Sequence, residues 1–225
     1  MSARTIALLL DALGETATMV GISAGLAVLA GIPLGILLLI TGRGHILEHP
    51  LFNRLVGTAV NALRSIPFII LLVAIIPLTR LIVGTSIGTV AAAVPLTIVA
   101  IAFLARQVEA SLREVDSGLV EAAQAMGATP FQIIAKVLVP EALPGIVAGL
   151  TITVVSLINY SAMAGAVGGG GLGDLGIRYG YQRFQGDVMA AVVVVLIVLV
   201  QLVQTGGDRL ARKLNKRQLD RASRR

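Results

Sequence analysis

The stretch TATMVGISAGLAVLAGIPLGILLLITG, from Thr16 to Gly42, contains no charged side chain. A helix of about 20 apolar residues crosses the roughly 30 Å of bilayer hydrocarbon, so this stretch is long enough to span a membrane. The chain as a whole has the same character: of 225 residues, 56% are hydrophobic and 13% charged, and the mean hydropathy is +0.91. A water-soluble domain of this size could not cover that much apolar surface. Composition therefore predicts a single membrane domain over residues 1–225.

Further apolar windows follow along the chain. They are Leu55–Thr79, interrupted only by Arg64; Leu81–Ala105, which starts with the turn region Gly84–Gly88; Ala142–Gly173, which ends in a glycine-rich loop; and Val188–Gly207. Each must be a helix, because open sheets leave backbone groups unpaired in lipid. The predicted fold is therefore an all-α integral membrane protein with five transmembrane helices.

Basic residues predict how these helices are oriented. Residues 206–225 hold eight Lys/Arg and two Asp, which accounts for the whole net charge of +6. A nucleic-acid-binding tail is one interpretation, but the cluster directly follows an apolar span, which favours a basic cytoplasmic tail under the positive-inside rule. The loop charges agree, since Arg106, Arg113 and Lys136 are expected in an inner loop and Arg80 alone in the outer loop before it. We therefore expect the N-terminus outside and the C-terminus inside.

The N-terminus is not typical of a signal peptide. Ile6–Leu10 is a short apolar patch interrupted by Asp11, without a small-residue cleavage site. We expect a short interfacial helix that leads into the first span. The chain has no cysteine, which excludes disulfides and Cys-ligated metals.

Two short motifs suggest chemistry that their context does not support. Gly171-x-Gly173-x-x-Gly176 matches the dinucleotide fingerprint, but it follows a membrane span instead of a strand. His45-x-x-Glu48-His49 matches the inverted zinc-protease pattern. This motif lies in a short loop bounded by glycines and Pro50, where a stable helix is hard to build. We therefore expect no metal site and no catalytic residue, and keep an intramembrane metalloenzyme as an alternative from a different class.

A polar segment, Glu121–Pro144, separates the third and fourth windows. Gly127 is expected to end a first short helix in left-handed geometry. Thr129 is expected to cap a second short helix, with Pro130 at its first position. The two would form a bent pair on the cytoplasmic surface. Their apolar stripe (Leu119, Ala122, Ala123, Met126) either packs on the chain itself or docks on a partner.

This segment resembles the EAA loop of binding-protein-dependent ABC importer permeases. The family motif reads EAA, three residues, Gly, nine residues, then Ile-x-Leu-Pro; here Glu121-Ala122-Ala123, Gly127 and Pro140 match in spacing. Val137 stands for the isoleucine and Val139 for the leucine. The likeness to methionine importer permeases continues at Arg64–Leu72, Gly84–Gly88, Met126–Pro130, Pro140–Gly145 and Tyr160–Met163, and so covers nearly the whole chain.

The resemblance implies a multi-pass permease of the bacterial inner membrane that carries methionine, D or L, by alternating access. It implies a homodimer, two ATPase subunits on the cytoplasmic face that hold ATP and Mg²⁺, an outer binding protein, and no cofactor on this chain. No phosphate-binding loop is present here, so the energy must come from another chain. The ATPase-coupling residues would be Glu121, Ala122, Ala123, Met126, Gly127, Ala128, Thr129 and Pro130.

The translocation path is less well defined. Tyr160, Ser161 and Met163 either form a gate near the outer side or simply pack between helices. Arg64 either reaches the membrane surface or pairs with an acid or carbonyl in the core. Another small substrate, or a passive channel that works without ATP, remains an alternative to methionine import.

Overall fold

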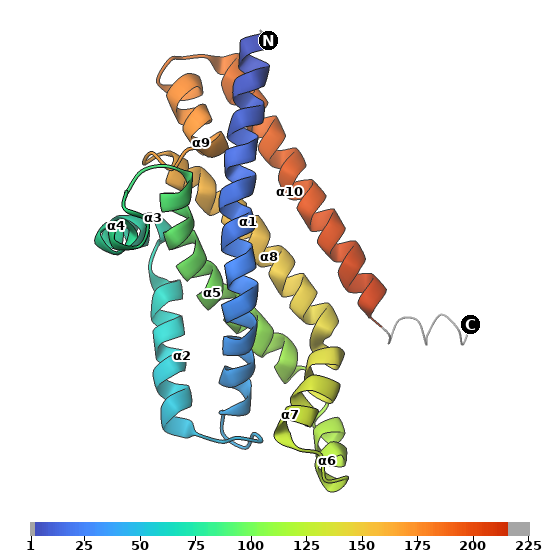
Figure 1. Ribbon diagram of the computed structural model, residues 1–225. Helices are drawn as coiled ribbons and strands as arrows, with labels where there is room; N and C mark the ends of the chain where they lie inside the picture. Colours follow the sequence, from blue (N-terminus) through green and yellow to red (C-terminus); the bar gives the residue numbers. More distant parts are fainter. Residues whose placement is uncertain (1–2, 216–225) are drawn as a thin grey trace, which may run out of the picture.

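The computed structural model describes residues 3–215, and every regular element in that range is helical. The elements are α1 (Ala3–Ile40), α2 (Pro50–Ser65), α3 (Phe68–Ala74), α4 (Ile76–Val83), α5 (Thr89–Arg113), α6 (Ser117–Ala125), α7 (Pro130–Ile133), the π-helical turn η1 (Ile134–Leu138), α8 (Val139–Gly165), α9 (Gly171–Leu175), the π-helical segment η2 (Gly176–Tyr181) and α10 (Gly186–Leu214). Figure 1 shows α1, α5 and α8 side by side, with α2 and α10 on opposite flanks.

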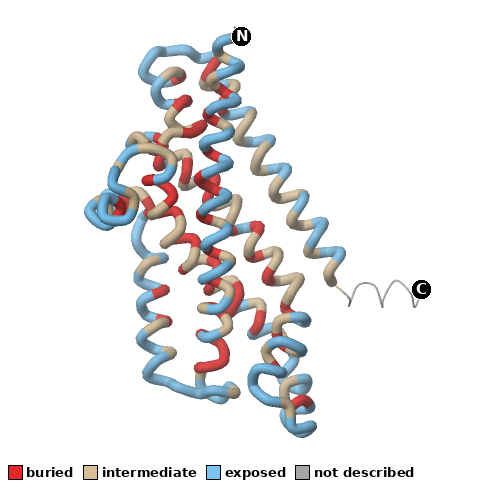
Figure 2. The backbone as a smooth tube through the Cα atoms, viewed as in Figure 1, coloured by how far each residue is buried: buried red, intermediate tan, exposed pale blue. Residues whose placement is uncertain are grey.

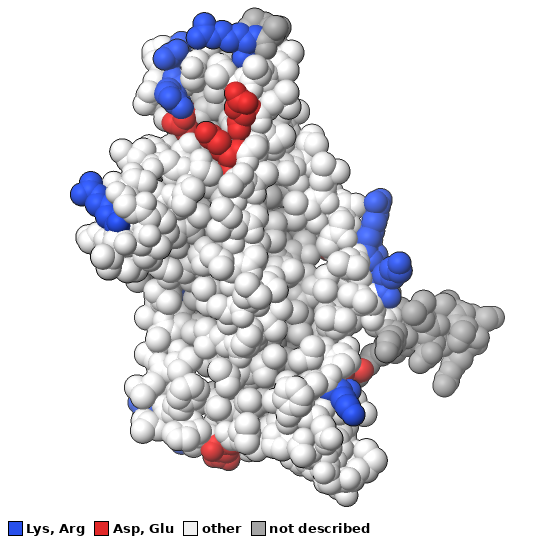
Figure 3. Space-filling view, viewed as in Figure 1, with Lys and Arg blue, Asp and Glu red and all other residues white. Residues whose placement is uncertain are grey.

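The expectation of an all-helical membrane fold is confirmed. Within the described residues, four helical stretches are long and apolar enough to cross a membrane: α1, α5, the continuous stretch from α7 to α8, and α10. The bent pair α2–α3 brings the number to as many as five. Figure 3 shows charged side chains at the two ends, on one flank and near the end of α10, with a broad uncharged area between.

The first span is longer than expected. Instead of a short interfacial helix followed by a span, α1 runs unbroken for 38 residues, about 57 Å at 1.5 Å per residue. Asp11 does not end the helix, because an exposed carboxylate is well tolerated on a helix surface and no Gly-Pro punctuation follows it. Pro33, further along, is accommodated inside the helix. The end of α1 nearest the N-terminus therefore projects beyond the hydrocarbon thickness.

The second window, Leu55–Thr79, is not one helix, and this expectation was wrong. The helix breaks at Ile66–Pro67, and α2 and α3 meet at 105°. Ile66 is extended (ψ 126°), as the residue before a proline prefers, and Pro67 cannot donate a backbone hydrogen bond to continue α2. The turn at Gly84–Gly88 is present as expected, but the next helix begins after it, at Thr89, and continues to Arg113.

Glycines allow the central helices to approach closely. A Cβ at Gly35 of α1 would lie 2.7 Å from the Cβ of Val108 on α5. A Cβ at Gly149 of α8 would lie 2.7 Å from the Cβ of Gln107 on α5. Close backbone contact through small residues is how membrane helices pack in the absence of a hydrophobic driving force. Figure 2 shows the buried residues concentrated along these helices, while α10 is largely intermediate or exposed.

The predicted basic tail, residues 206–225, does not begin as a separate segment. α10 continues through Gly206 and Gly207 to Leu214. The side chain of Thr151 on α8 lies directly against Gly207, so α10 is packed on α8 at this point. Residues 216–225 of the predicted tail lie outside the described residues.

Candidate functional site

The segment from α6 to η1 (residues 117–138), hereafter the α6–η1 segment, forms the end of the molecule opposite the N-terminus. Figure 1 shows α6 and α7 projecting beyond the ends of α5 and α8. The turn between α1 and α2 lies at the same end. The N-terminus of α1 and the start of α10 lie at the other end, so the segment is remote from them.

Local chemistry fixes the shape of the first helix. The carboxylate of Asp116 accepts from the backbone N–H of Gly118 at 2.8 Å and so caps α6. Gly127 follows the helix with φ +79°, and the N–H of Ala128 then donates to the carbonyl of Ala123 at 3.0 Å. The prediction of a left-handed glycine at this position is confirmed.

The start of the second helix is also as expected. The hydroxyl of Thr129 accepts from the N–H of Gln132 at 3.4 Å, and the Gln132 side chain accepts from the N–H of Thr129 at 2.9 Å. This reciprocal pair is a capping box, with Pro130 in the first turn, where its missing N–H costs nothing. The bend between the two helices is therefore held by backbone and side-chain bonds among residues 122–132.

The second helix is not a short separate one, which corrects the expectation of a bent pair. η1 leads directly into α8, and the backbone is helical from Pro130 to Gly165. Pro140 and Pro144 lie inside this helix instead of ending it. The π-helical turn just before them adjusts the hydrogen-bond register, one of the few ways in which a helix absorbs proline.

The segment has one side packed on the chain and one side exposed. Ala123 and Ile133 are 4% and 1% exposed and belong to the main core. Met126 and Phe131 are 81% and 76% exposed, at the tip of the molecule. The predicted apolar stripe is thus divided, since Ala123 packs inward whereas Leu119, Ala122 and Met126 face outward.

Glu121 is exposed and makes no hydrogen bond or ion pair within the described part of the chain. The residues one turn away from it along α6 (Ser117, Gly118, Gln124 and Ala125) carry no charge. A carboxylate held free beside Ala122 and Met126 is available to a donor from outside the chain.

The residues predicted for the translocation path have different environments. Tyr160 stacks on Phe68, the first residue of α3. Ser161 is buried and donates its hydroxyl to the carbonyl of Ile158 at 2.8 Å, whereas Met163 is 39% exposed. The Ser161 side chain is therefore enclosed within the fold, whereas part of the Met163 side chain lies at the surface.

Arg64 follows neither of its two predicted arrangements fully. It lies in the last turn of α2 and is exposed, and its guanidinium carbon lies 5.5 Å from the centre of the Phe103 ring on α5. This is a cation–π contact. Among the described residues, Arg64 has no acidic partner.

A buried charged group was missed by the sequence reasoning. Glu109 in α5 has an 8% exposed side chain, with Arg106 at 2.5 Å and Arg113 at 2.7 Å. The expectation that both arginines lie in a loop was wrong, because α5 runs on to Arg113. The i, i+3 and i, i+4 spacing of the two arginines from Glu109 is the sequence signal from which this group could have been predicted.

The two misleading motifs have structural roles. Gly171–Gly176 forms α9 and the start of η2 after a helix, with no strand before it. The Glu15 carboxylate accepts from the N–H of Gly171 at 2.6 Å, which ties this turn to α1. His49 caps α2 by accepting from the N–H of Phe52 at 3.2 Å through Nδ1. Within residues 3–215, no three His, Asp or Glu side chains gather as metal ligands would.

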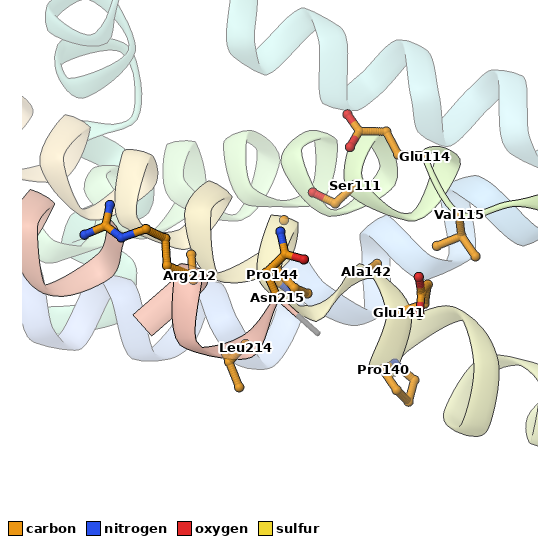
Figure 4. A pocket seen from close by; sticks show the side chains of 12 residues that line it. Ser111, Glu114, Val115, Pro140, Glu141, Ala142, Pro144, Arg212, Leu214 and Asn215 are labelled. Carbon is orange, nitrogen blue, oxygen red and sulfur yellow. The ribbon is translucent and has the colours of Figure 1, made fainter. Parts of the chain in front are cut away.

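A cavity of about 390 Å³ lies at the base of the α6–η1 segment, where α5 ends, α8 begins and α10 ends. Figure 4 shows Glu114 and Ser111 on α5, Glu141 and Pro144 on α8, and Arg212 and Asn215 on or after α10. The Arg212 side chain extends away from Glu141 in this view. The cavity therefore lies between the start of α8, which directly follows the α6–η1 segment, and the end of α10.

Comparison with known proteins places this arrangement in a family. Residues 18–219 match the family described as binding-protein-dependent transport system inner membrane component. A Vibrio cholerae protein named probable D-methionine transport system permease protein MetI is 58% identical over 210 residues, covering 93% of each chain. A Pasteurella multocida protein of the same name is 47% identical over 203 residues, covering 90% of this chain and 94% of the other.

A solved structure has the same fold over nearly the full chain. It is described as an inward-facing conformation of the MetNI methionine ABC transporter. One of its chains is 51% identical to this one with a TM-score of 0.93, covering 95% of this chain and 99% of that chain. The geometry and the sequence thus point to the same relatives.

Proposed function

Because this chain belongs to the family of binding-protein-dependent transport system inner membrane components, we propose that it forms the translocation path for methionine in an ATP-driven importer. The chain is a multi-pass permease of the bacterial inner membrane and is not itself an enzyme. The observation that carries the proposed substrate is the 47–58% identity, over at least 90% of this chain, to two proteins named as D-methionine permeases.

The α6–η1 segment is the proposed contact with the ATPase subunits. Its exposed Met126 and Phe131 offer an apolar tip, and the free carboxylate of Glu121 offers an acceptor. Large exposed apolar residues at the end of a membrane protein suit a protein groove, as in helix-in-groove recognition. The coupling set proposed is Glu121, Ala122, Ala123, Met126, Gly127, Ala128, Thr129 and Pro130, with Ala123 acting from the packed side.

Two copies of the chain would enclose the path. Two ATPases would bind on the cytoplasmic side, and a binding protein would deliver substrate on the outer side. ATP and Mg²⁺ would be bound by the ATPases. The likeness to an inward-facing transporter supports assigning this conformation to the inward-facing state. The α6–η1 end would then lie in the cytoplasm and the N-terminus outside, in agreement with the distribution of Lys and Arg.

Tyr160 and Met163 on α8, together with Arg64 at the end of α2, are proposed to line the path or its gate. The exposed side of Met163 suits closure against its counterpart in a second copy, since a thioether adapts its shape readily. Ser161 would act by allowing close packing beside them.

Uptake by the reconstituted complex tests the proposal. The chain, its ATPase and its binding protein are placed in liposomes, and labelled L- and D-methionine uptake is measured with ATP and with a hydrolysis-deficient ATPase. ATP-dependent uptake that unlabelled methionine suppresses, but other amino acids do not, is expected. Equal uptake without ATP hydrolysis would indicate a passive channel, and suppression by another amino acid would indicate a different substrate.

A further inference from the structure

Helix α2 is attached to α1 and α5 along one narrow side. Near its start the Asn53 side chain donates to the carbonyl of Leu38 at 2.6 Å, and at its end Arg64 lies over the Phe103 ring. Only two of its residues, Gly57 and Val60, are buried. Val60 belongs to a small cluster with Leu38 of α1 and Ala102 and Ala105 of α5. At its far end the 105° break separates α2 from α3. A helix with one narrow contact strip and a break at its end can move as a unit.

One charged contact reinforces this strip. The Nη2 atom of Arg106, on α5, donates to the backbone carbonyl of Gly57 at 2.8 Å. Its Nη1 atom donates to Glu109 at 2.5 Å, and Glu109 is buried on the same helix. Arg106 therefore joins the two helices, while Glu109 neutralises its charge. A guanidinium can do both because its donors are fixed in a planar fork.

The arrangement leaves one donor unpaired. The Nε–H group of Arg106 is buried and has no hydrogen-bond partner among the described residues. A buried donor without a partner is unfavourable, and each such case calls for an explanation. A contact that leaves a buried donor unpaired stabilises this arrangement less than a fully paired one would, which suits a contact that opens.

Gly57 is suited to this contact. A Cβ at position 57 would lie 3.2 Å from Nη2 of Arg106, so any side chain there would press on the guanidinium. Contact of the arginine with the α2 backbone thus depends on the absence of a side chain.

We propose that Arg106 is a positioning residue that latches α2 onto α5 in the inward-facing state and releases it during the transport cycle. This inference rests on the proposed function, since it assigns the latch to one state of an ATP-driven permease. The latch consists of Arg106, Glu109 and the Gly57 carbonyl. Opening it would expose the strip between α2 and α5, including Val60.

Thiol labelling tests the latch directly. The chain has no cysteine, so Val60→Cys introduces its sole thiol, at a side chain that is 4% exposed. The assembled complex with its ATPase is treated with N-ethylmaleimide, and labelling of this position is followed by peptide mass spectrometry. In the otherwise unchanged complex, slow labelling without nucleotide and at least fivefold faster labelling after trapping with ATP and vanadate are expected.

Two variants weaken the latch in different ways. Arg106→Gln removes the guanidinium that bonds to both Glu109 and the Gly57 carbonyl. Labelling at position 60 without nucleotide is expected to be about tenfold faster, and basal ATP hydrolysis higher. Gly57→Ala keeps every charge, favours the helix and displaces the guanidinium, so an intermediate increase of about threefold is expected. The matched controls are Arg54→Gln, an exposed arginine of α2, and Gly206→Ala, a helical glycine with open space around it; both should label slowly.

The outcomes are decisive in both directions. Faster labelling of both latch variants, with slow controls, supports the latch. Slow labelling of both variants without nucleotide overturns it, as does an unchanged rate on ATP trapping. If the Arg106→Gln complex does not assemble, Gly57→Ala alone decides. Methionine uptake by the unmodified complex is measured separately, so failure of the latch is distinguishable from failure of the proposed function.

Discussion

The aromatic rings of Phe68 and Tyr160 are stacked, with their centroids 4.9 Å apart and their planes inclined by 15°. Phe68 is the first residue of α3, directly after the break at Pro67, and Tyr160 lies in α8. The stack thus joins the broken helix to the helix that carries the proposed gate.

Replacing Tyr160 by Ala is expected to lower stability and transport together. Loss of a stacked, partly buried ring costs about 2–3 kcal/mol, so the detergent-solubilised protein should melt a few degrees lower. Tyr160→Phe retains the stack and should preserve both properties. If Phe and Ala variants lose transport equally, the hydroxyl and not the stack is what transport requires.

Met126→Asp is expected to prevent binding of the ATPase without affecting membrane insertion. Met126 is 81% exposed, so its replacement removes no packing within the chain, but it would place a charge in an apolar groove. Co-purification with the ATPase should fall at least tenfold. Leu47→Asp, an exposed leucine in the turn at the same end of the molecule, is the matched control. An undiminished yield of complex would argue against docking at this tip.

The bend at Gly127 is expected to tolerate Asn but not Val. Its φ of +79° lies in the left-handed region, where Asn is tolerated but a β-branched residue is strained by more than about 1 kcal/mol. We expect Gly127→Val to reduce ATP-driven uptake severalfold, while Gly127→Asn remains near the original rate. Uptake in proteoliposomes, normalised to the amount of complex, measures this; equal rates for the two variants would mean that the bend is not needed.

The bond from Glu15 to the N–H of Gly171 is expected to stabilise the turn before α9. Glu15→Ala leaves that N–H unpaired and should destabilise the protein by about 1 kcal/mol, whereas Glu15→Gln keeps an acceptor and should cost less. Thermal unfolding in detergent measures both. Asp11→Ala, an exposed carboxylate one turn earlier on α1, is the control and should leave the melting temperature unchanged. A similar loss for Asp11→Ala would assign the effect to charge alone.

Local backbone chemistry was predictable from the sequence, because it depends on neighbouring residues only. The left-handed Gly127, the Thr129 cap and Pro130 in the first turn all follow from steric and hydrogen-bonding rules that act within a few residues. The turn at Gly84–Gly88 was predictable for the same reason. These features fix the shape of the candidate site.

The effect of proline was not predictable, because it depends on the surroundings. Pro67 breaks a helix, whereas Pro140 and Pro144 lie within one. The difference lies in the π-helical turn beside Pro140 and in core contacts such as that of Ile146, which hold α8 in place. A list of residues does not show which of these arrangements tertiary packing will favour.

The buried Glu109 was missed for a related reason. A charged triplet at the end of an apolar window suggests a solvated loop, since membrane helices usually end at such residues. Burial of Glu109 depends on α5 continuing to Arg113 and on the packing of other helices around it, which no local pattern specifies. Arg64 illustrates the same limit, because its partner is the Phe103 ring, far along the chain.

The unbroken helix from Pro130 to Gly165 is 36 residues long, or about 54 Å at 1.5 Å per residue. The helix has no break between Phe131, near its first end, and Met163, near its other end. A rotation of about 5° about one end would sweep the other by about 5 Å, as this length dictates. A displacement of a few ångströms at the far end of the helix thus needs only a slight tilt, because no break along the helix would absorb the movement.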